Sequence, residues 1–230
     1  MEIIQDNWYD SRDVEIQDYT KSPINSVIEK TLHKTGEMLD IYAENINYNG
    51  KRTYTKVGKM QREEAHLTGA LHTGAQVWVY NPQGYVLLQK RAMTVKSSPG
   101  LLDTSAAWHV RSGKTIISDG LRELKQEIGL IRKPEDLLHI GNYRRETKKI
   151  TTSGFQHNNE INKVFLLKYE GGIHELKKQK SEVSELTFIT LEQLEDDWKN
   201  PQTIALYTSK GEQYRQMVLM NIKNILWCSR

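Results

Sequence analysis

The first half of the chain shows the alternation of apolar and polar residues that is typical of β-strands. The clearest case is residues 75–91, AQVWVYNPQGYVLLQKR. There the NPQG of residues 81–84 puts Asn, Pro and Gly where a type I turn prefers them, so we predict a β-hairpin. A second hairpin is predicted within residues 38–57, around the turn dipeptide Asn49-Gly50. The β-forming residues of the first hairpin are Val77, Val79, Val86 and Leu88.

A helical period replaces this alternation near the middle of the chain. Leu121, Leu124 and Ile128 recur at i, i+3 and i+7, which is the spacing of one helix face. We therefore predict a helix over residues 118–128, ended by Gly129 as a left-handed cap.

The second half is predicted to combine strands and helices. Strands near residues 138–145 and 163–169 are followed by a third, LTFIT, and by a helix that begins with the capping-box spacing of Thr190 and Gln193. Residues 211–227 predict a last amphipathic helix. Its buried side would carry Tyr214, Met217, Val218, Ile222, Ile225 and Leu226. Mixed strands around a central helix, with later helices, predict an α/β (α+β) sandwich.

We expect three parts along the chain. Residues 1–36 are polar and weakly periodic, and we predict an N-terminal appendage that contains a short helix over residues 23–36. This appendage would dock on the core or on a partner chain, which leaves a homodimer open. The main domain would span residues 37–200, and residues 201–230 would form a C-terminal helix packed on that domain.

Length and composition narrow the class of protein. The 230 residues fit one well-cored domain with long ends, or one domain plus a small one. A net charge of +3 lies far from that of a dedicated nucleic-acid binder, so we expect no nucleic-acid partner. The single cysteine, Cys228, excludes a disulfide framework within the chain and favours a reducing compartment. Because no signal peptide and no apolar run of membrane-spanning length is visible, we expect a soluble, cytoplasmic protein without a membrane partner.

The predicted central helix carries the candidate chemistry. Asp119, Glu123 and Glu127 stand at i, i+4 and i+8 and would place three carboxylates on one helix face. A hard divalent cation such as Mg²⁺ would relieve their repulsion and could bridge to substrate phosphates. Arg122, one step around the helix, could orient a carboxylate through a forked contact. Spacing alone favours the simpler interpretation, which is a solvated acidic helix face.

A family resemblance shifts the balance from a solvated helix face towards a metal site. Residues 122–130, RELKQEIGL, resemble the end of the Nudix box, G-x5-E-x7-R-E-U-x-E-E-x-G-U, in which U is a bulky aliphatic residue. HTGAQVWVYNPQGYVLLQKRA, PGLLDTSAAWHV and NNEINKVFLL are similar to the isopentenyl-diphosphate-isomerase-like branch of Nudix proteins, over about residues 37–194. The resemblance implies a Nudix-type α/β/α sandwich with a mixed sheet. It also implies Mg²⁺- or Mn²⁺-dependent attack of water on a diphosphate, with Glu123 and Glu127 as metal ligands.

The chain departs from the box at three positions. In the alignment, Lys114 replaces the first glutamate of the box, Gln126 replaces the first of the two adjacent glutamates, and Trp108 stands at the opening glycine. Glu to Lys adds two charge units and Glu to Gln adds one, so the site is three units more positive than the family pattern. This change is expected to weaken metal binding, because a unit charge about 4 Å away is worth roughly 4 kcal/mol at a dielectric constant of about 20.

The resemblance also gives roles to residues outside the box. Glu160 matches a glutamate that faces the metal site, either as a ligand or to orient the attacking water. His66, His72 and His109 match histidines that bind a second metal in true isopentenyl-diphosphate isomerases, and such a trio suits Zn²⁺ or Mn²⁺. Isolated histidines are more often hydrogen-bonded scaffold, and we favour that interpretation here. Because Ala107 stands where the isomerases need a catalytic cysteine, isomerase activity is disfavoured.

Basic and aromatic residues are the candidates for binding a substrate. Lys90 and Arg91 follow the hairpin and could hold a diphosphate, although a solvated hairpin end is equally compatible with them. Trp108 could turn outward, fill the cleft or stack on a ligand, and we favour filling of the cleft. Trp78 is expected in the core.

Two functions from different classes remain open at this stage. The first is a Nudix hydrolase of a small-molecule diphosphate, such as a nucleoside diphosphate derivative, with Glu123, Glu127 and Glu160 as catalytic residues. The second is a catalytically inactive binding or regulatory module that keeps the pocket. Retention of the three glutamates favours the first function, and the three departures favour the second.

Overall fold

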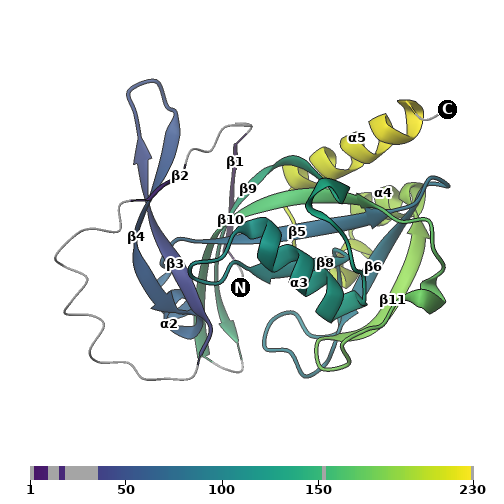
Figure 1. The fold of residues 1–230 in the computed structure, drawn as a ribbon, viewed down its shortest axis with the longest axis horizontal. Coiled ribbons are helices and arrows are strands. Elements are labelled where there is room, and N and C mark those ends of the chain that lie inside the picture. The colour runs from purple at the N-terminus through teal and green to yellow at the C-terminus, as the bar shows by residue number, and fades with distance from the viewer. Residues whose placement is uncertain (1–2, 10–15, 19–35, 152–153, 229–230) are drawn as a thin grey trace.

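One mixed β-sheet forms the centre of the molecule (Figure 1). The computed structural model describes residues 3–9, 16–18, 36–151 and 154–228. Within them, eleven strands join in one sheet, and seven follow the order β1-β9-β10-β5-β3-β4-β2. Strands β6 and β8 also pair with β5, and β7 and β11 pair with β6. The strands are β1 (Ile3–Tyr9), β2 (Ile16–Asp18), β3 (Met38–Ile46), β4 (Arg52–Gln61), β5 (His72–Tyr80), β6 (Tyr85–Arg91), β7 (Leu102–Asp103), β8 (Ala106–His109), β9 (Leu137–Thr151), β10 (Gly154–Lys168) and β11 (Val183–Thr190).

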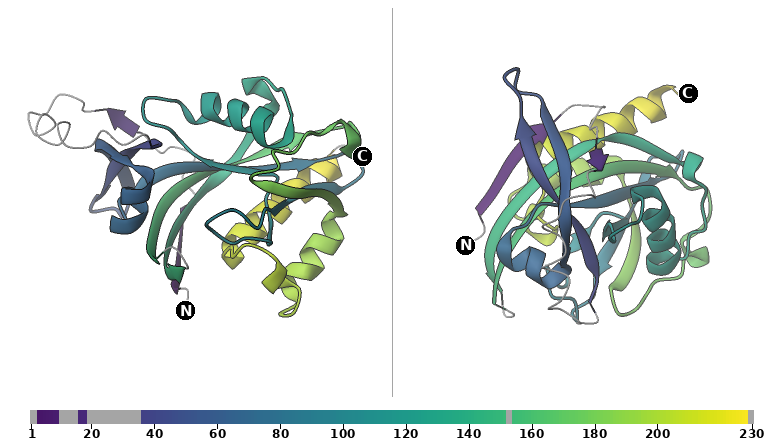
Figure 2. Two further views of the ribbon diagram at one scale, coloured as in Figure 1. Left: turned by 90° about the horizontal axis from the view of Figure 1, so that it is seen from below. Right: turned by 60° about the vertical axis from the view of Figure 1, so that its left-hand side comes forward.

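Helices cover both faces of this sheet. The helix α3 (Ile116–Ile128) lies on one face, and α4 (Leu191–Lys199) and α5 (Glu212–Cys228) lie on the other (Figure 2). A short helix, α2 (Arg62–Thr68), connects β4 to β5. Three 3₁₀ turns, Pro134–Asp136, Ile173–Glu175 and Ile204–Leu206, complete the described elements. The predicted α/β/α sandwich with a mixed sheet is therefore confirmed.

The central strand β5 divides the core into two layers. It runs parallel to β10 and is buried along its whole length, so its alternating side chains fill both faces. Val77 and Val79 pack on the α3 side with Leu124, whereas Trp78 packs on the other side with Tyr214 of α5. The Trp78 Nε1 donates a hydrogen bond to the Tyr214 hydroxyl at 2.8 Å, which ties α5 to the sheet. Trp78 is 1% exposed, so its predicted place in the core is confirmed.

Most predicted elements are present. The turn in residues 81–84 closes the β5–β6 hairpin, and the second hairpin joins β3 to β4. The helix α3 begins at Ile116, two residues earlier than predicted, because the Thr115 side chain accepts a hydrogen bond from Ser118 N at 3.1 Å. It ends at Gly129, whose φ of 76° is the left-handed cap that the sequence predicts.

The structure differs from the prediction at several places. Strands β9 and β10 are both longer than predicted, and α2 was not predicted. The predicted short helix over residues 23–36 lies outside the described residues, apart from Gly36. Within the predicted appendage, β1 pairs with β9 and β2 pairs with β4. The division into three parts stays a prediction. No helix in the described part of the chain is long and apolar enough to cross a membrane.

Candidate metal centre

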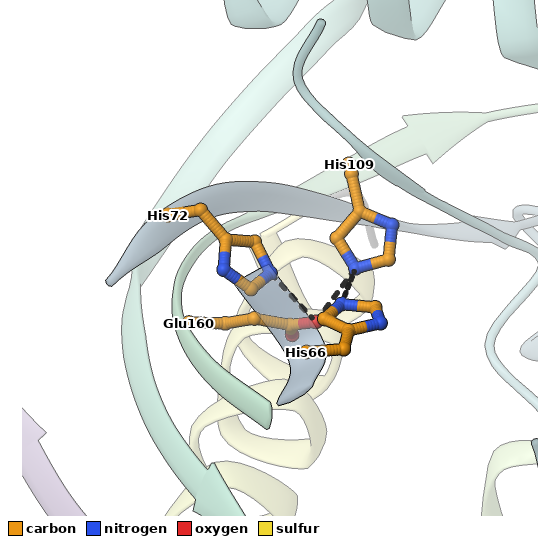
Figure 3. Close-up of side chains that lie close together, drawn as sticks. All are labelled: His66, His72, His109 and Glu160. Atoms are coloured by element: carbon orange, nitrogen blue, oxygen red, sulfur yellow. Dashed lines mark hydrogen bonds and ion pairs between the residues drawn. The ribbon is translucent and has the colours of Figure 1, made fainter. Parts of the chain in front are cut away.

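Four side chains with metal-ligand atoms converge at one end of β5 (Figure 3). His72 opens β5 opposite Glu160 of β10, and His109 of β8 pairs with Gly74 of β5. Because residues two apart in a strand share a face, these three side chains lie on one side of the sheet. The helix α2, packed against β10, contributes His66. We call His66, His72, His109 and Glu160 the His₃Glu group.

The ligand atoms of the His₃Glu group lie close together, all within 4.8 Å of one another. His109 Nε2 lies 2.9 Å from Glu160 Oε1 and 3.2 Å from His66 Nε2. His72 Nε2 lies 3.7 Å from the same Glu160 oxygen. Three imidazole nitrogens and a carboxylate directed at one small volume form a donor set that suits a divalent transition metal.

The surroundings of His72 fix the orientation of one ligand atom. Its Nδ1 lies 2.8 Å from the carbonyl oxygen of Ala70, so Nδ1 carries the proton and Nε2 keeps its lone pair. The Nε2 atom is buried and makes no hydrogen bond to any described residue. A buried polar atom without a partner costs about 1–3 kcal/mol, and a bound metal would remove this cost. The residues present therefore fit a metal ion.

Glu160 is held as an anion by donors on several sides. Asn158 Nδ2 donates to Oε1 at 2.6 Å, and Asn162 Nδ2 donates to Oε2 at 2.8 Å. Burial alone would raise the pKa of Glu160, but the adjacent imidazoles of His109 and His72 hold this pKa well below 4.5. The group therefore offers one negative ligand to a cation.

Two of the three histidines, His66 and His109, have lowered pKa values. Burial, followed by the neighbouring rings of His109 and His72, lowers the pKa of His66 to about 3. Burial also lowers the pKa of His109, against the opposing influence of Glu160. Because only a neutral imidazole can coordinate a metal, both rings are available as ligands at pH 7.

The carboxylates of α3 form a separate cluster on the other face of the sheet. Glu127 is 3% exposed, and its Oε2 has no hydrogen-bond partner among the described residues. Glu123, one turn earlier, contacts the guanidinium of Arg122. No contact in the described chain joins Glu160 to Glu123 or Glu127. Asp119 does not join them either, because its buried carboxylate accepts hydrogen bonds from Arg111.

The charge around α3 is unfavourable for two ionised carboxylates. Burial first, then the charges of Glu123 and Glu182, raise the pKa of Glu127 well above 4.5. Burial likewise raises the pKa of Glu123, although Arg122 opposes this shift. The buried, unpartnered oxygen of Glu127 is suited to contact a cation. Because the pKa values of both Glu123 and Glu127 are raised, however, these two carboxyl groups carry less negative charge than a fully ionised pair would.

Comparison with known proteins decides the family. The NUDIX domain model matches residues 70–207, which is more than half of the chain. The chain belongs to the Nudix family. It is 30% identical to an uncharacterised Nudix hydrolase of Clostridium acetobutylicum over 161 residues, which cover 69% of this chain and 72% of that protein.

Two further proteins are similar to this chain. An isopentenyl-diphosphate Δ-isomerase of Serratia proteamaculans is 32% identical over 73 residues, which cover 32% of this chain but only 41% of the isomerase. The crystal structure of DR0079 from Deinococcus radiodurans aligns with a TM-score of 0.53 at 16% identity, over 82% of this chain and 98% of that one. This last similarity shows the Nudix fold alone.

The three departures from the Nudix box have clear places in the structure. Lys114 and Gln126 are exposed, and Gln126 accepts a hydrogen bond from Arg122. The Trp108 ring is 7% exposed and packs in the core against Gly120 of α3, where an added Cβ would overlap the ring. The side chain lies on the α3 face of β8, opposite to the His₃Glu group. A substrate-binding role for Trp108 stays a prediction.

The two basic residues predicted to bind substrate differ in their surroundings. Lys90 is exposed at the end of β6. Arg91 is engaged within the protein, because its Nε donates to the carbonyl oxygen of Ser97 at 2.9 Å and its Nη1 lies 3.5 Å from Asp103. Arg91 therefore stabilises the loop of residues 92–101 as well as contributing positive charge near Glu127.

Sequence reasoning missed several residues around the two sites. Asn158 and Asn162 orient Glu160, and the spacing of residues 158, 160 and 162 on one strand face was a signal that could have revealed them. Glu182 lies in the loop before β11 and acts on both α3 glutamates, but no local pattern indicates this contact. Asp40 of β3 accepts a hydrogen bond from Ser112 Oγ at 2.6 Å and so holds the loop before α3.

Proposed function

We propose that this Nudix protein hydrolyses a small-molecule organic diphosphate with the help of a divalent metal bound by the His₃Glu group. The observation that carries the proposal is the buried, unpartnered Nε2 of His72, which is directed at the ligand atoms of the other three residues. Mixed nitrogen and oxygen donors favour Mn²⁺ or another transition metal over Mg²⁺, which prefers oxygen ligands alone.

The His₃Glu group is a better metal site than the α3 cluster for electrostatic reasons. Glu160 is an anion in the protein without metal, and its pKa is lowered, whereas the pKa values of Glu123 and Glu127 are raised. A cation entering the His₃Glu group meets an ionised carboxylate, whereas a cation at Glu127 competes with a proton that the raised pKa of this carboxyl favours. We therefore expect α3 to bind a cation only at millimolar concentrations or more weakly.

The chain's own residues would divide the work of the reaction. When bound, the metal would lower the pKa of a coordinated water and offset phosphate charge. Asn158 and Asn162 hold the Glu160 carboxylate in place, and Ala70 fixes the tautomer of His72. Catalytic roles for Glu123 and Glu127 stay a prediction, because both belong to α3 on the other face of the sheet. The water oxygen would bond to one phosphorus while the bond from that phosphorus to its leaving oxygen breaks.

A second candidate function is a Nudix-fold module that binds a diphosphate without turnover. The specific observation in its favour is the state of α3, because Glu127 is buried with a raised pKa and Lys114 and Gln126 occupy box positions that carry glutamate in the family pattern. Isomerase activity is not proposed, because Ala107 lacks the thiol that the resemblance requires. A cytoplasmic location and a homodimer also stay predictions.

The test is a screen of organic diphosphates with the full chain, stripped of metal and then supplied with Mn²⁺, Mg²⁺ or Zn²⁺. Phosphate released by a coupled phosphatase reports turnover. We expect Mn²⁺-dependent turnover that Glu160→Gln abolishes and that the exposed matched control, Glu170→Gln, leaves unchanged. Diphosphate binding without turnover in any metal would support the binding module. Turnover that survives Glu160→Gln would contradict the proposed centre.

A further inference from the structure

Arg111 presents a guanidinium of fixed orientation in the loop that follows His109 of the His₃Glu group. Asp119 is 1% exposed and accepts hydrogen bonds from Arg111 N at 2.7 Å and from Arg111 Nε at 2.9 Å. It also accepts one from Nη2 of the same residue. A buried carboxylate is costly unless it is paired, and Asp119 is paired on both of its oxygens. The Arg111 side chain nevertheless remains 38% exposed.

The exposed part of Arg111 has unused donors. A guanidinium carries five N–H groups, and Asp119 engages only those on Nε and Nη2. No described residue accepts a hydrogen bond from Nη1. A planar guanidinium with free donors is the group that proteins use to bind phosphate oxygens in forked fashion.

The loop that carries Arg111 is held from a second side. Ser112 N donates to the Met38 carbonyl at 2.7 Å, and Asp40 accepts from Ser112 Oγ at 2.6 Å and from Gly113 N at 3.3 Å. Strand β3 and helix α3 therefore fix residues 111–113 between them. A binding group that is already ordered loses little entropy when it meets a ligand.

Arg111 is close along the chain to one candidate site and close in space to part of the other. It follows His109 by two residues, so their Cα atoms are at most roughly 7 Å apart. On the other side, Glu123 and Glu37 are near enough for their charges to act on the Arg111 guanidinium. Glu37 in turn pairs with Arg62 at 3.2 Å, and the charge of Arg62 acts on His109.

We propose that Arg111, positioned by Asp119, binds the phosphate oxygens of the substrate and supplies positive charge that a metal on α3 would otherwise supply. The inference rests on the proposed function, because it assigns a role in binding the same diphosphate. The chain has Lys114 where the family pattern has a glutamate, so this loop has become basic. Arg111 adds a positive group of fixed orientation to this loop, within reach of the charge of Glu123. Asp119 acts as a positioning residue and does not itself contact the substrate.

The test measures binding of methylene diphosphonate, which resists hydrolysis, to the full chain by calorimetry with saturating Mn²⁺. We expect Arg111→Gln to weaken this binding roughly tenfold or more, because a charge-assisted contact is lost. Binding of Mn²⁺ alone should change less than about twofold, because Arg111 is not a ligand. The matched control is Arg132→Gln, which removes a partly exposed guanidinium that lies over the Tyr169 ring, 5.5 Å from its centroid.

Two further variants keep the test informative if Arg111→Gln folds poorly. Arg111→Lys keeps the positive charge but lacks the paired donors of the guanidinium, so it should recover only part of the affinity for methylene diphosphonate. Asp119→Asn should weaken diphosphonate binding while Mn²⁺ binding is retained. Unchanged diphosphonate affinity in a folded Arg111→Gln protein would overturn the inference and leave the proposed function standing. A wild-type protein that binds Mn²⁺ but no diphosphonate would overturn both.

Discussion

His72 is the residue whose surroundings define the candidate centre most fully. Its Nδ1 is committed to Ala70, its ring is fully buried, and its Nε2 faces Glu160 without a hydrogen bond. The sequence alone did not favour this role, because histidines at residues 66, 72 and 109 are separated by loops and show no local metal-binding spacing. The register of β5 with β8 and β10 brings His72 and His109 together, and the packing of α2 on β10 adds His66.

The first prediction concerns this residue. Replacing His72 with alanine removes a neutral ligand that the fold holds ready, so affinity for Mn²⁺ should fall roughly tenfold or more. Calorimetric titration of the metal-free chain measures the effect. The control is His174→Ala, because His174 is exposed in the turn Ile173–Glu175. Equal affinity in the wild type and in His72→Ala would remove His72 from the centre.

The second prediction concerns the pH dependence of the metal-free protein. The pKa of His66 is lowered from 6.5 to about 3, and that of His109 is lowered too, so the unfolded chain binds more protons than the folded one below pH 6.5. Stability should therefore decrease as the pH falls from 7.5 to 5. Thermal unfolding at both pH values measures the difference in Tm, which should be smaller in His66→Gln. If the difference in Tm between the two pH values is the same in His66→Gln and in the wild type, then the pKa of His66 does not contribute to the pH dependence of stability, and this prediction is wrong.

At the level of elements, the sequence predicted those with strong local signals. The helix α3 has a regular apolar period and a glycine cap, and the β5–β6 hairpin has a turn of known type. The helix α2 was missed because its seven residues bury only Ala65 and show no apolar period. The full length of β9 and β10 was also missed, because their ends carry polar residues whose pairing is set by the partner strand.

The third prediction tests the contact between β8 and α3. Trp108 packs on Gly120 so closely that an added Cβ would overlap the ring. Gly120→Ala should therefore destabilise the fold by about 1–3 kcal/mol, although alanine favours the helix itself. Urea unfolding measures the change, and the less bulky ring in Trp108→Phe should lessen the cost of Gly120→Ala in a double-mutant cycle. Stabilisation by Gly120→Ala in the wild-type background would contradict this packing.

The fourth prediction tests the charge of the loop and helix that correspond to the Nudix box. Lys114→Glu with Gln126→Glu restores the family pattern and adds three negative units near Glu123 and Glu127. Cation affinity at α3 should rise, so a titration with Mg²⁺ should show a site that is absent or much weaker in the wild type. The exposed pair Lys180→Glu and Gln213→Glu makes the same charge change and serves as the control. If the restored chain binds Mg²⁺ no better, then charge is not what limits α3.

At the scale of the whole molecule, the sheet separates the two candidate sites. The His₃Glu group lies on the face of β5 that also carries Trp78, and α3 covers the opposite face. The sequence predicted the Nudix fold and named all the glutamates and histidines concerned, but it grouped Glu160 with the α3 carboxylates. The grouping of Glu160 with the α3 carboxylates stays a prediction. The contacts in the described part of the chain join Glu160 to His109 and His72 instead. Such a grouping depends on strand order, which residue spacing alone does not determine.

The most direct test of the central claim is the anomalous scattering of Mn²⁺ in crystals of the full chain soaked at a concentration well below millimolar. The account predicts a strong peak within bonding distance of the Nε2 atoms of His66, His72 and His109 and of a Glu160 oxygen, with little or none beside Glu127. A peak beside Glu123 and Glu127 with none at the His₃Glu group would contradict the account.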